Sequence, residues 1–275
     1  MHVMKLVLNI TEPLQRAAQR YFEAAKRARK KAKGARAAIE RARKEAKEAQ
    51  HAAPRIEKPS LKQKRKKEWY ERFRWCLTSD GFLLVGGRDA TTNEILIKKH
   101  TEKNDIVFHT DMAASPFVIL KTKGKTPPDT SLEEAAGFVA IHSRAWKLGL
   151  STTEVFHVRP DQVSKEAKAG EVLPKGSFMI YGKTTYHHPR VEAAVGLLNG
   201  SVLAGPISAV THHCKQAIQI KPGRMKKSEA AKQLRNELGG GELDDYLSAL
   251  PSGGISIVKE KQTKKRTATA KATRR

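Results

Sequence analysis

The chain has 275 residues, of which 39% are apolar, and it carries a formal net charge of +25. This length and apolar content allow one domain of ordinary size with additional segments, or two small domains. Its two cysteines, Cys76 and Cys214, fit neither a zinc-binding spacing nor a disulfide framework, so we expect buried thiols in a reducing compartment. The start lacks a cleavable signal pattern and no apolar run approaches about 18 residues, which favours a soluble cytoplasmic protein without a membrane helix.

The positive charge is concentrated at the two ends of the chain. Residues 1–75 contain 23 Lys and Arg against 8 Asp and Glu, and residues 259–275 contain 8 against 1. The residues between them are almost neutral. Basic segments attached to a nearly neutral domain are typical of proteins that bind the phosphate backbone of nucleic acids.

A long helix is expected near the N-terminus. From Leu14 to Ala49, apolar residues, most of them alanine, recur at steps of three and four. This repeat is typical of a coiled-coil seam that binds a partner helix, either within this chain or in another protein. Two prolines break the pattern, and a capping box at Ser60–Gln63 predicts a shorter basic helix through Trp75. We therefore expect a basic coiled-coil hairpin over residues 1–68.

From Thr78 onward the apolar pattern changes from helical to strand-like. Short runs such as FLLV, EILI, DIVFH and FVILK, separated by Gly, Asn, Asp and Pro, indicate strands joined by turns. A capping box at Ser131–Glu134 predicts a helix that ends near Gly149, and two more helices are expected at 228–238 and 244–250. These elements predict an α+β fold over residues 69–258, mainly antiparallel sheet with a few packed helices. A disordered basic tail is expected at 259–275.

The segment GGRDATTNE, residues 86–94, lies between two of the strand-like runs. Gly86 and Gly87 allow a sharp turn, and Asp89 can accept hydrogen bonds within it, so the segment is predicted to be a polar hairpin turn. Such a turn does not need Arg88. A planar guanidinium beside exposed backbone amides suits a phosphate or a base edge.

The sequence contains no complete catalytic or metal-binding pattern. The segment GSFMIYGKT, residues 176–184, has the wrong glycine spacing for a phosphate-binding loop, and His109 and Asp111 have no third ligand near them in the sequence. We therefore expect no cofactor and no metal. One alternative is an enzyme of tRNA modification or RNA metabolism, which requires Asp89, Asp105, His109 and Asp111 to converge. Another is nonspecific DNA binding by the basic ends.

Four segments in order resemble one family. WYERFRW, SDGFLLVGGRDATTNEILIKK, DIVFHTD and QVSKEAKAGEVLPKGSFMIYGK are similar to the NFACT-R domain, the RNA-binding module of the RqcH and NEMF proteins, with the archaeal members nearest. The resemblance covers about residues 69–258, and the preceding helix is similar to the family's coiled-coil region. It implies ribosome-associated quality control, with binding to tRNA and to the large ribosomal subunit that peptidyl-tRNA obstructs after stalling. The family's NFACT-N domain has no room here, so a separately encoded partner carrying it is expected.

The resemblance also selects candidate residues. Candidates for RNA contact keep the family's motifs or lie beside them: Arg88, Asn93, Lys98, Lys99, His109, Lys165, Lys175 and Lys183. Candidates for shaping the backbone are Gly86, Gly87, Asp89, Glu94, Gly176 and Gly182. A histidine and a glycine of the family are replaced here by Ala113 and Ala114, which removes one expected RNA contact and one close backbone approach.

Overall fold

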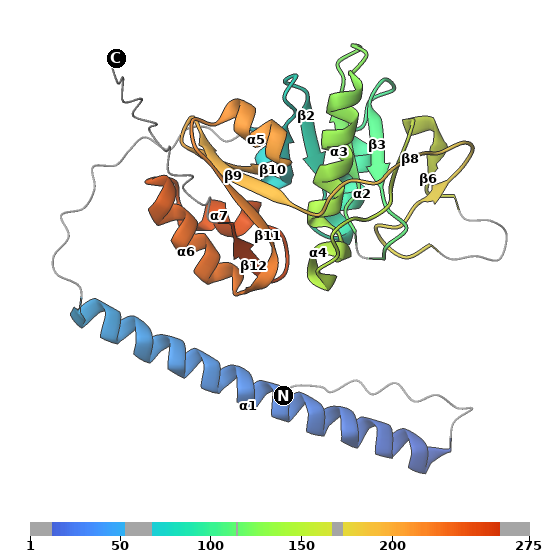
Figure 1. Cartoon of the computed structure of the whole chain (residues 1–275). Coiled ribbons are helices and arrows are strands. Elements are labelled where there is room, and N and C mark those ends of the chain that lie inside the picture. The colour runs from blue at the N-terminus through green and yellow to red at the C-terminus, as the bar shows by residue number, and fades with distance from the viewer. Residues whose placement is uncertain (1–12, 53–67, 114, 167–172, 259–275) are drawn as a thin grey trace, which may run out of the picture. The chain divides into compact units, whose positions relative to one another are not determined.

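The computed structural model describes residues 13–52, 68–113, 115–166 and 173–258 (Figure 1). The chain divides into two units, Met1–Lys66 and Lys67–Arg275. No helix in these ranges is long and apolar enough to cross a membrane. Cys76 and Cys214 are both buried free thiols, as predicted.

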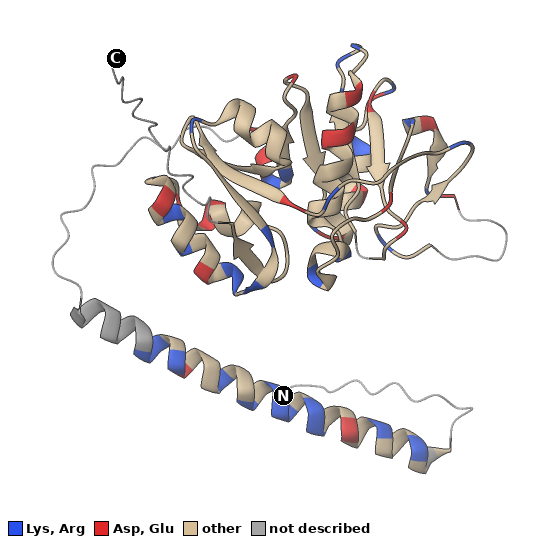
Figure 2. Ribbon diagram, in the orientation of Figure 1, with Lys and Arg blue, Asp and Glu red and all other residues tan. Residues whose placement is uncertain are grey.

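The first unit is described as one long helix, α1 (Leu14–Ala52). Within residues 15–44 every side chain except that of Ala17 is exposed. Figure 2 shows Lys and Arg recurring along this helix with few acids between them. The predicted long basic helix is thus confirmed, while its partner helix stays a prediction.

The predicted return helix is wrong where the structure describes it. Residues 53–67 lie outside the described ranges, so the hairpin itself stays a prediction. After them, Trp69–Arg72 form a short 3-10 helix, η1, and Arg74–Leu77 form strand β1. Phe73 and Cys76 are buried, because this segment pairs with the next strand instead of continuing a helix. Tertiary packing therefore overrides the helical spacing of the aromatic residues.

The second unit is built around an antiparallel sheet of six strands in the order β1-β2-β4-β3-β5-β8. The five strands that join β1 in this sheet are β2 (Leu83–Gly86), β3 (Ile106–His109), β4 (Val118–Lys121), β5 (Val155–Val158) and β8 (Thr185–His187). Short apolar strands separated by turns are what the sequence predicted.

Alternation along these strands separates two cores. Leu84, Phe108 and Leu120 point to one face, where the buried helix α3 (Asp129–His142) packs. Val85 and Ile119, the next residues along β2 and β4, point to the other face, where Leu96 of helix α2 (Ala90–His100) packs. Beside α2, the same face is covered by a two-stranded ribbon of β6 (Val163–Ser164) and β7 (Met179–Ile180), preceded by a short 3-10 helix, η2 (Pro160–Gln162).

A second antiparallel sheet has four strands in the order β10-β9-β11-β12 and shares the core of α3 (Figure 1). Its strands are β9 (Ala193–Leu198), β10 (Ser201–Gly205), β11 (Ala217–Met225) and β12 (Ile255–Ile257). The remaining helices are α4 (Arg144–Leu148), α5 (Ile207–His213), α6 (Lys227–Leu238) and α7 (Leu243–Ala249). Segregated sheets and helices confirm the predicted α+β class.

Two local predictions are corrected. The run EILI is not a strand, because Asp89 caps α2 and the run continues that helix. Ser131 does not cap α3, which begins at Asp129 after Pro128. Its hydroxyl donates to Asp80, while Glu134 accepts hydrogen bonds from the backbone of Ser79 and the hydroxyl of Ser208. Both side chains of the predicted capping box thus bind neighbouring elements across the fold.

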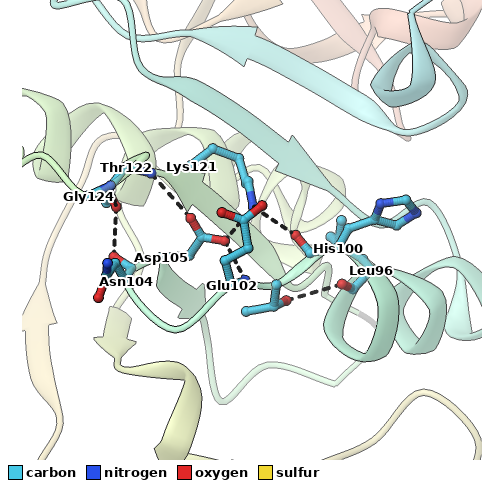
Figure 3. Close-up of polar contacts among 9 residues, drawn as sticks. Leu96, His100, Glu102, Asn104, Asp105, Lys121, Thr122 and Gly124 are labelled. Carbon is cyan, nitrogen blue, oxygen red and sulfur yellow. Dashed lines mark hydrogen bonds and ion pairs between the residues drawn. The ribbon is translucent and has the colours of Figure 1, made fainter.

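A buried ion pair fixes one end of the first sheet (Figure 3). The Lys121 ammonium lies 2.6 Å from the Asp105 carboxylate and 2.9 Å from Glu102, and it donates to the backbone carbonyl of His100. Asp105 also accepts hydrogen bonds from the backbone of Thr122 and of Glu102. Because Lys121 and Asp105 are both buried, each compensates the desolvation of the other.

Asp105→Asn is expected to lower the free energy of unfolding by about 3 kcal/mol, because it leaves Lys121 buried beside a neutral group. Urea unfolding with an unchanged m-value measures this loss. Glu102→Gln is the matched control: it removes a solvent-exposed partner of the same lysine and should cost much less. Equal losses in the two variants would contradict this account of the pair.

Candidate nucleic-acid interface

The segment predicted as a hairpin turn is instead a strand-to-helix junction. β2 ends at Gly86, and the Asp89 carboxylate accepts hydrogen bonds from the Thr92 backbone at 2.8 Å and from its hydroxyl at 3.0 Å. These hydrogen bonds lower the pKa of Asp89. A Cβ on Gly87 would lie 1.9 Å from Oδ1 of Asn93, so only glycine fits there. Asn93 is buried, and its Oδ1 accepts a hydrogen bond from the Phe117 backbone at 3.2 Å.

Arg88 uses its guanidinium to join separate parts of the chain. Its Nε donates to the carbonyl of Arg72 at 3.0 Å and Nη2 to that of Phe73 at 2.9 Å. Nη1 donates to the carbonyl of Ser248, in α7, at 3.2 Å. The side chain that was not needed for a turn therefore joins the end of η1 and the residue after it to α7. Two of its five N–H groups are not used by these bonds and remain available to a ligand.

The second matched motif packs directly against the first. Gly176 has a φ of +79°, and a Cβ there would lie 2.5 Å from the Ala90 Cα. Lys165 donates to the carbonyls of Pro174 and Ser177, both at 3.0 Å, which holds the loop before β7. Farther along, the Gln162 amide donates to the carbonyls of Tyr181 and Lys183, on either side of Gly182. Two motifs about 70 residues apart in the sequence thus form one surface.

A cavity of about 800 Å³ lies where these motifs meet. Two acids, Asp89 and Asp111, reach it, and Asp89 is already engaged as a helix cap. The cationic side chains that line it are Arg74, Arg88, Arg144, Lys147 and Lys175. Aromatic and other apolar side chains form a further part of its lining: Met112, Phe117, Phe156, Phe178 and Ile180. The cavity is therefore cationic in net charge and has an apolar wall.

Behind the cavity, cations are crowded together. Burial, followed by the charge of Arg88, lowers the pKa of Arg74 to about 10, and burial with the charges of Arg74 and Arg88 lowers that of Lys227 to about 8. Arg74 donates to Nδ1 of His142, whose pKa is held well below its ordinary range by burial, so that ring is neutral. In the described part of the chain no carboxylate pairs with Arg74 or Lys227. Partly buried cations that no carboxylate neutralises favour an anionic ligand.

The structure separates the predicted RNA-contact residues into two groups. Arg88, Asn93, His109 and Lys175 line the cavity, as do Gly87, Asp89 and Gly176 of the backbone-shaping set. His109 stacks on Phe117 with ring centroids 3.9 Å apart, and its Nδ1 donates to the carbonyl of Pro116. The remaining candidates lie outside the cavity lining: Lys98, Lys99, Lys165, Lys183, Gly86, Glu94 and Gly182. Among them, Lys98 forms an ion pair with Glu94 at 2.7 Å.

Three of the four residues that an enzyme would require, Asp89, His109 and Asp111, line the cavity, but Asp105 does not join them. Asp105 lies at the opposite end of β3 from His109 and is bound to Lys121. Asp89 is exposed but already caps α2, and Asp111 is the other exposed carboxylate at the cavity. The described residues also contain no group of three or more His, Cys, Asp or Glu that could hold a metal ion. No catalytic site is therefore visible in this part of the chain.

Several residues of the cavity were not found by sequence reasoning. Arg74, His142 and Ser252 lie on elements far apart in the chain, and Arg144 and Lys147 belong to a short helix without a recognisable motif. Ser115 is buried with no hydrogen-bond partner for its hydroxyl in the described structure. None of these residues has a local pattern, because the fold alone brings them together.

Comparison with known proteins identifies this surface. Residues 72–182, which contain both motifs, match the model of the NFACT protein RNA binding domain. Over this range the chain is similar to an NFACT RNA-binding domain. Arg74, Arg88, His142 and Lys175 lie inside the matched range, while Lys227, Ser248 and Ser252 lie beyond its end.

Several ribosome quality control proteins are also similar to this chain. The chain is 39% identical over 215 residues to the archaeal Rqc2 homolog aRqcH of Methanocaldococcus jannaschii, covering 74% of this chain and 32% of that protein. It is 39% identical over 141 residues to a Drosophila melanogaster protein named ribosome quality control complex subunit NEMF homolog, covering 50% of this chain and 14% of that protein. The human ribosome quality control complex subunit NEMF is 38% identical over 133 residues, 47% of this chain and 12% of that protein. The chain thus spans about a third or less of the length of these relatives.

The contact between the two motifs is tested by Gly176→Ala. The added methyl group meets the backbone of Ala90, and the left-handed conformation disfavours any side chain. The matched control is Gly200→Ala, which has a φ of +80° but nothing within 4 Å of the added Cβ. We expect the control to lower the free energy of unfolding by about 1–2 kcal/mol from backbone strain alone. Gly176→Ala should lose about 1–3 kcal/mol more from overpacking, measured by urea unfolding. Equal losses would show that the close approach of the motifs does not matter.

Proposed function

We propose that this chain is an RNA-binding module of ribosome-associated quality control. The observation that carries the proposal is the convergence of two NFACT motifs on one cavity of positive net charge. Relatives that share the domain are named as subunits of ribosome quality control complexes. A noncatalytic binding role agrees with a site that holds many cations but no assembled catalytic group.

The more specific proposal names the target. The module binds tRNA, ribosomal RNA or both on large ribosomal subunits that peptidyl-tRNA obstructs after stalling in the cytoplasm. The basic helix α1 and the basic segment 259–275 add attraction to phosphate backbones, which carries no sequence information, while the folded domain supplies the specific contacts. An NFACT-N domain is the proposed partner of this module.

The RNA-binding surface is tested by charge reversal at the cavity. The double variant Arg144→Glu, Lys175→Glu changes two exposed cavity residues, and Lys103→Glu, Arg224→Glu makes the same change in net charge at exposed positions outside the cavity lining. We expect the cavity variant to weaken binding to tRNA and to reduce the slope of log K against log salt concentration by about two, because two phosphate contacts are lost. The control should change both quantities much less. Equal effects would mean that the protein binds RNA through net charge alone.

Arg88→Ala is unsuitable for this purpose, because it also removes three hydrogen bonds to backbone carbonyls. A loss of RNA binding in that variant would not distinguish a lost contact from a disturbed fold.

The quality-control role has its own test. Cosedimentation at physiological salt should show that the full chain prefers large subunits carrying peptidyl-tRNA over empty ones, and that deleting 259–275 keeps this preference. Preference requires shape recognition by the folded domain, whereas a polycation binds both subunits equally. Equal binding that is lost with the tail would contradict the proposed role.

A further inference from the structure

The cavity combines the two chemical features of a nucleotide. Arg74 and Arg88 face it from one side, beside the neutral ring of His142. Phe178 also lines it, half-buried and nearly perpendicular to the ring of the buried Phe117, with ring centroids 5.3 Å apart. A cationic region binds phosphate, and an apolar aromatic region binds the face or edge of a base.

Two buried polar atoms of the lining have no partner in the described structure. They are the Nε–H of Arg74 and the hydroxyl of Ser115, which is 5% exposed. Buried donors are nearly always satisfied in native proteins, so each such atom requires an explanation. A ligand in the cavity would explain both atoms, because the Arg74 Nε–H and the Ser115 hydroxyl can each donate a hydrogen bond to an acceptor oxygen of the ligand.

The size of the cavity limits what can enter. About 800 Å³ is within the range of sites that enclose small ligands, and it is far too small for a duplex or for several nucleotides of a strand. A nucleic acid can therefore enter only as a short single-stranded element, such as one nucleotide at an end of the strand or turned out of its stack. Such a nucleotide would carry its own phosphate into the cationic region.

The cationic region also depends on residues beyond the NFACT match. Lys227, at the start of α6, donates to the carbonyl of Leu250, and Ser252 accepts a hydrogen bond from Arg74. Arg88 reaches the carbonyl of Ser248 in the same segment. The second sheet and its helices thus close the cationic region and hold its charges near one another.

We propose that the cavity is a pocket for a single RNA nucleotide, with the phosphate bound beside Arg74 and Ser115 and the base against the half-buried side chains of Phe178 and Met112. This inference rests on the proposed RNA-binding function. It adds that the part of the RNA bound in the cavity is one nucleotide. The shared chemistry is a nucleoside phosphate, whose source is either an RNA strand or a free mononucleotide.

The experiment fills the pocket without changing its charge. Ala113 is exposed and lines the cavity, so Ala113→Trp occupies the space with little effect on the core. Thr126→Trp, at an exposed position outside the cavity lining, is the matched control. Calorimetric titration with AMP, adenosine and hexaadenylate is carried out on the full chain and both variants, and urea unfolding verifies that each variant is folded.

Three results are expected if the proposal holds. AMP binds the natural chain at one site and more tightly than adenosine, by about tenfold or more, because the phosphate carries the charge. Ala113→Trp abolishes AMP binding and weakens hexaadenylate binding by about tenfold or more, since the inserted nucleotide loses its contacts. Thr126→Trp binds both ligands like the natural chain.

Other results overturn the proposal and can be told apart. Hexaadenylate binding could survive Ala113→Trp but be lost in the Arg144→Glu, Lys175→Glu variant. RNA would then contact the exposed cations around the cavity and not its interior. That result would refute the nucleotide pocket and leave the proposed RNA-binding function intact. Binding of AMP without any hexaadenylate binding would assign the pocket to free nucleotides and refute its RNA role. If neither Ala113→Trp nor the Arg144→Glu, Lys175→Glu variant changes hexaadenylate binding, both the nucleotide pocket and the proposed RNA-binding function of this surface are refuted.

Discussion

The hydrogen bonds of the Arg88 guanidinium fix the arrangement on which the candidate interface depends. They connect the junction between β2 and α2 with the carbonyls of Arg72 and Phe73 and with Ser248 near the end of α7. The buried Asn93 adjoins this tie and holds the loop between β3 and β4 through the backbone of Phe117. One short segment, GGRDATTNE, therefore positions three walls of the cavity. The residues of this segment mainly hold other parts of the chain in position. Those other parts supply most of the charge and the apolar surface of the cavity.

The Lys and Arg side chains of the two units differ in their exposure to solvent. Lys and Arg recur along α1 (Figure 2), and those within residues 15–44 are exposed, so they attract phosphates through a field that salt screens. In the folded domain Arg74 and Lys227 are partly or largely removed from water, and mutual repulsion adds to the effect of burial. Cations held in this way gain more from a bound anion than exposed ones do. This difference supports separate roles for the two kinds of cation: the basic segments attract RNA through its phosphates, and the cavity selects what is bound specifically.

Sequence patterns predicted most of the architecture, because strand alternation and helix spacing are local properties. They failed where tertiary contacts decided the outcome. The run EILI became a helix because Asp89 caps it, and Ser131 became a cross-fold contact because the helix began earlier. For the site, the quoted motifs located Arg88 and Lys175, but nothing local indicated Arg74 or the other cations that the two sheets bring together. Such a cluster is created by topology and is visible only in three dimensions.

The central claim is that RNA enters the cavity formed by the two motifs. Photo-crosslinking of the full chain to RNA that contains 4-thiouridine, followed by mass spectrometric mapping, tests it without any substitution. The account predicts crosslinks at residues that line the cavity, with Met112 and Phe178 among them. Crosslinks confined to α1 and to 259–275 would contradict it, because RNA would then be bound by the basic segments alone.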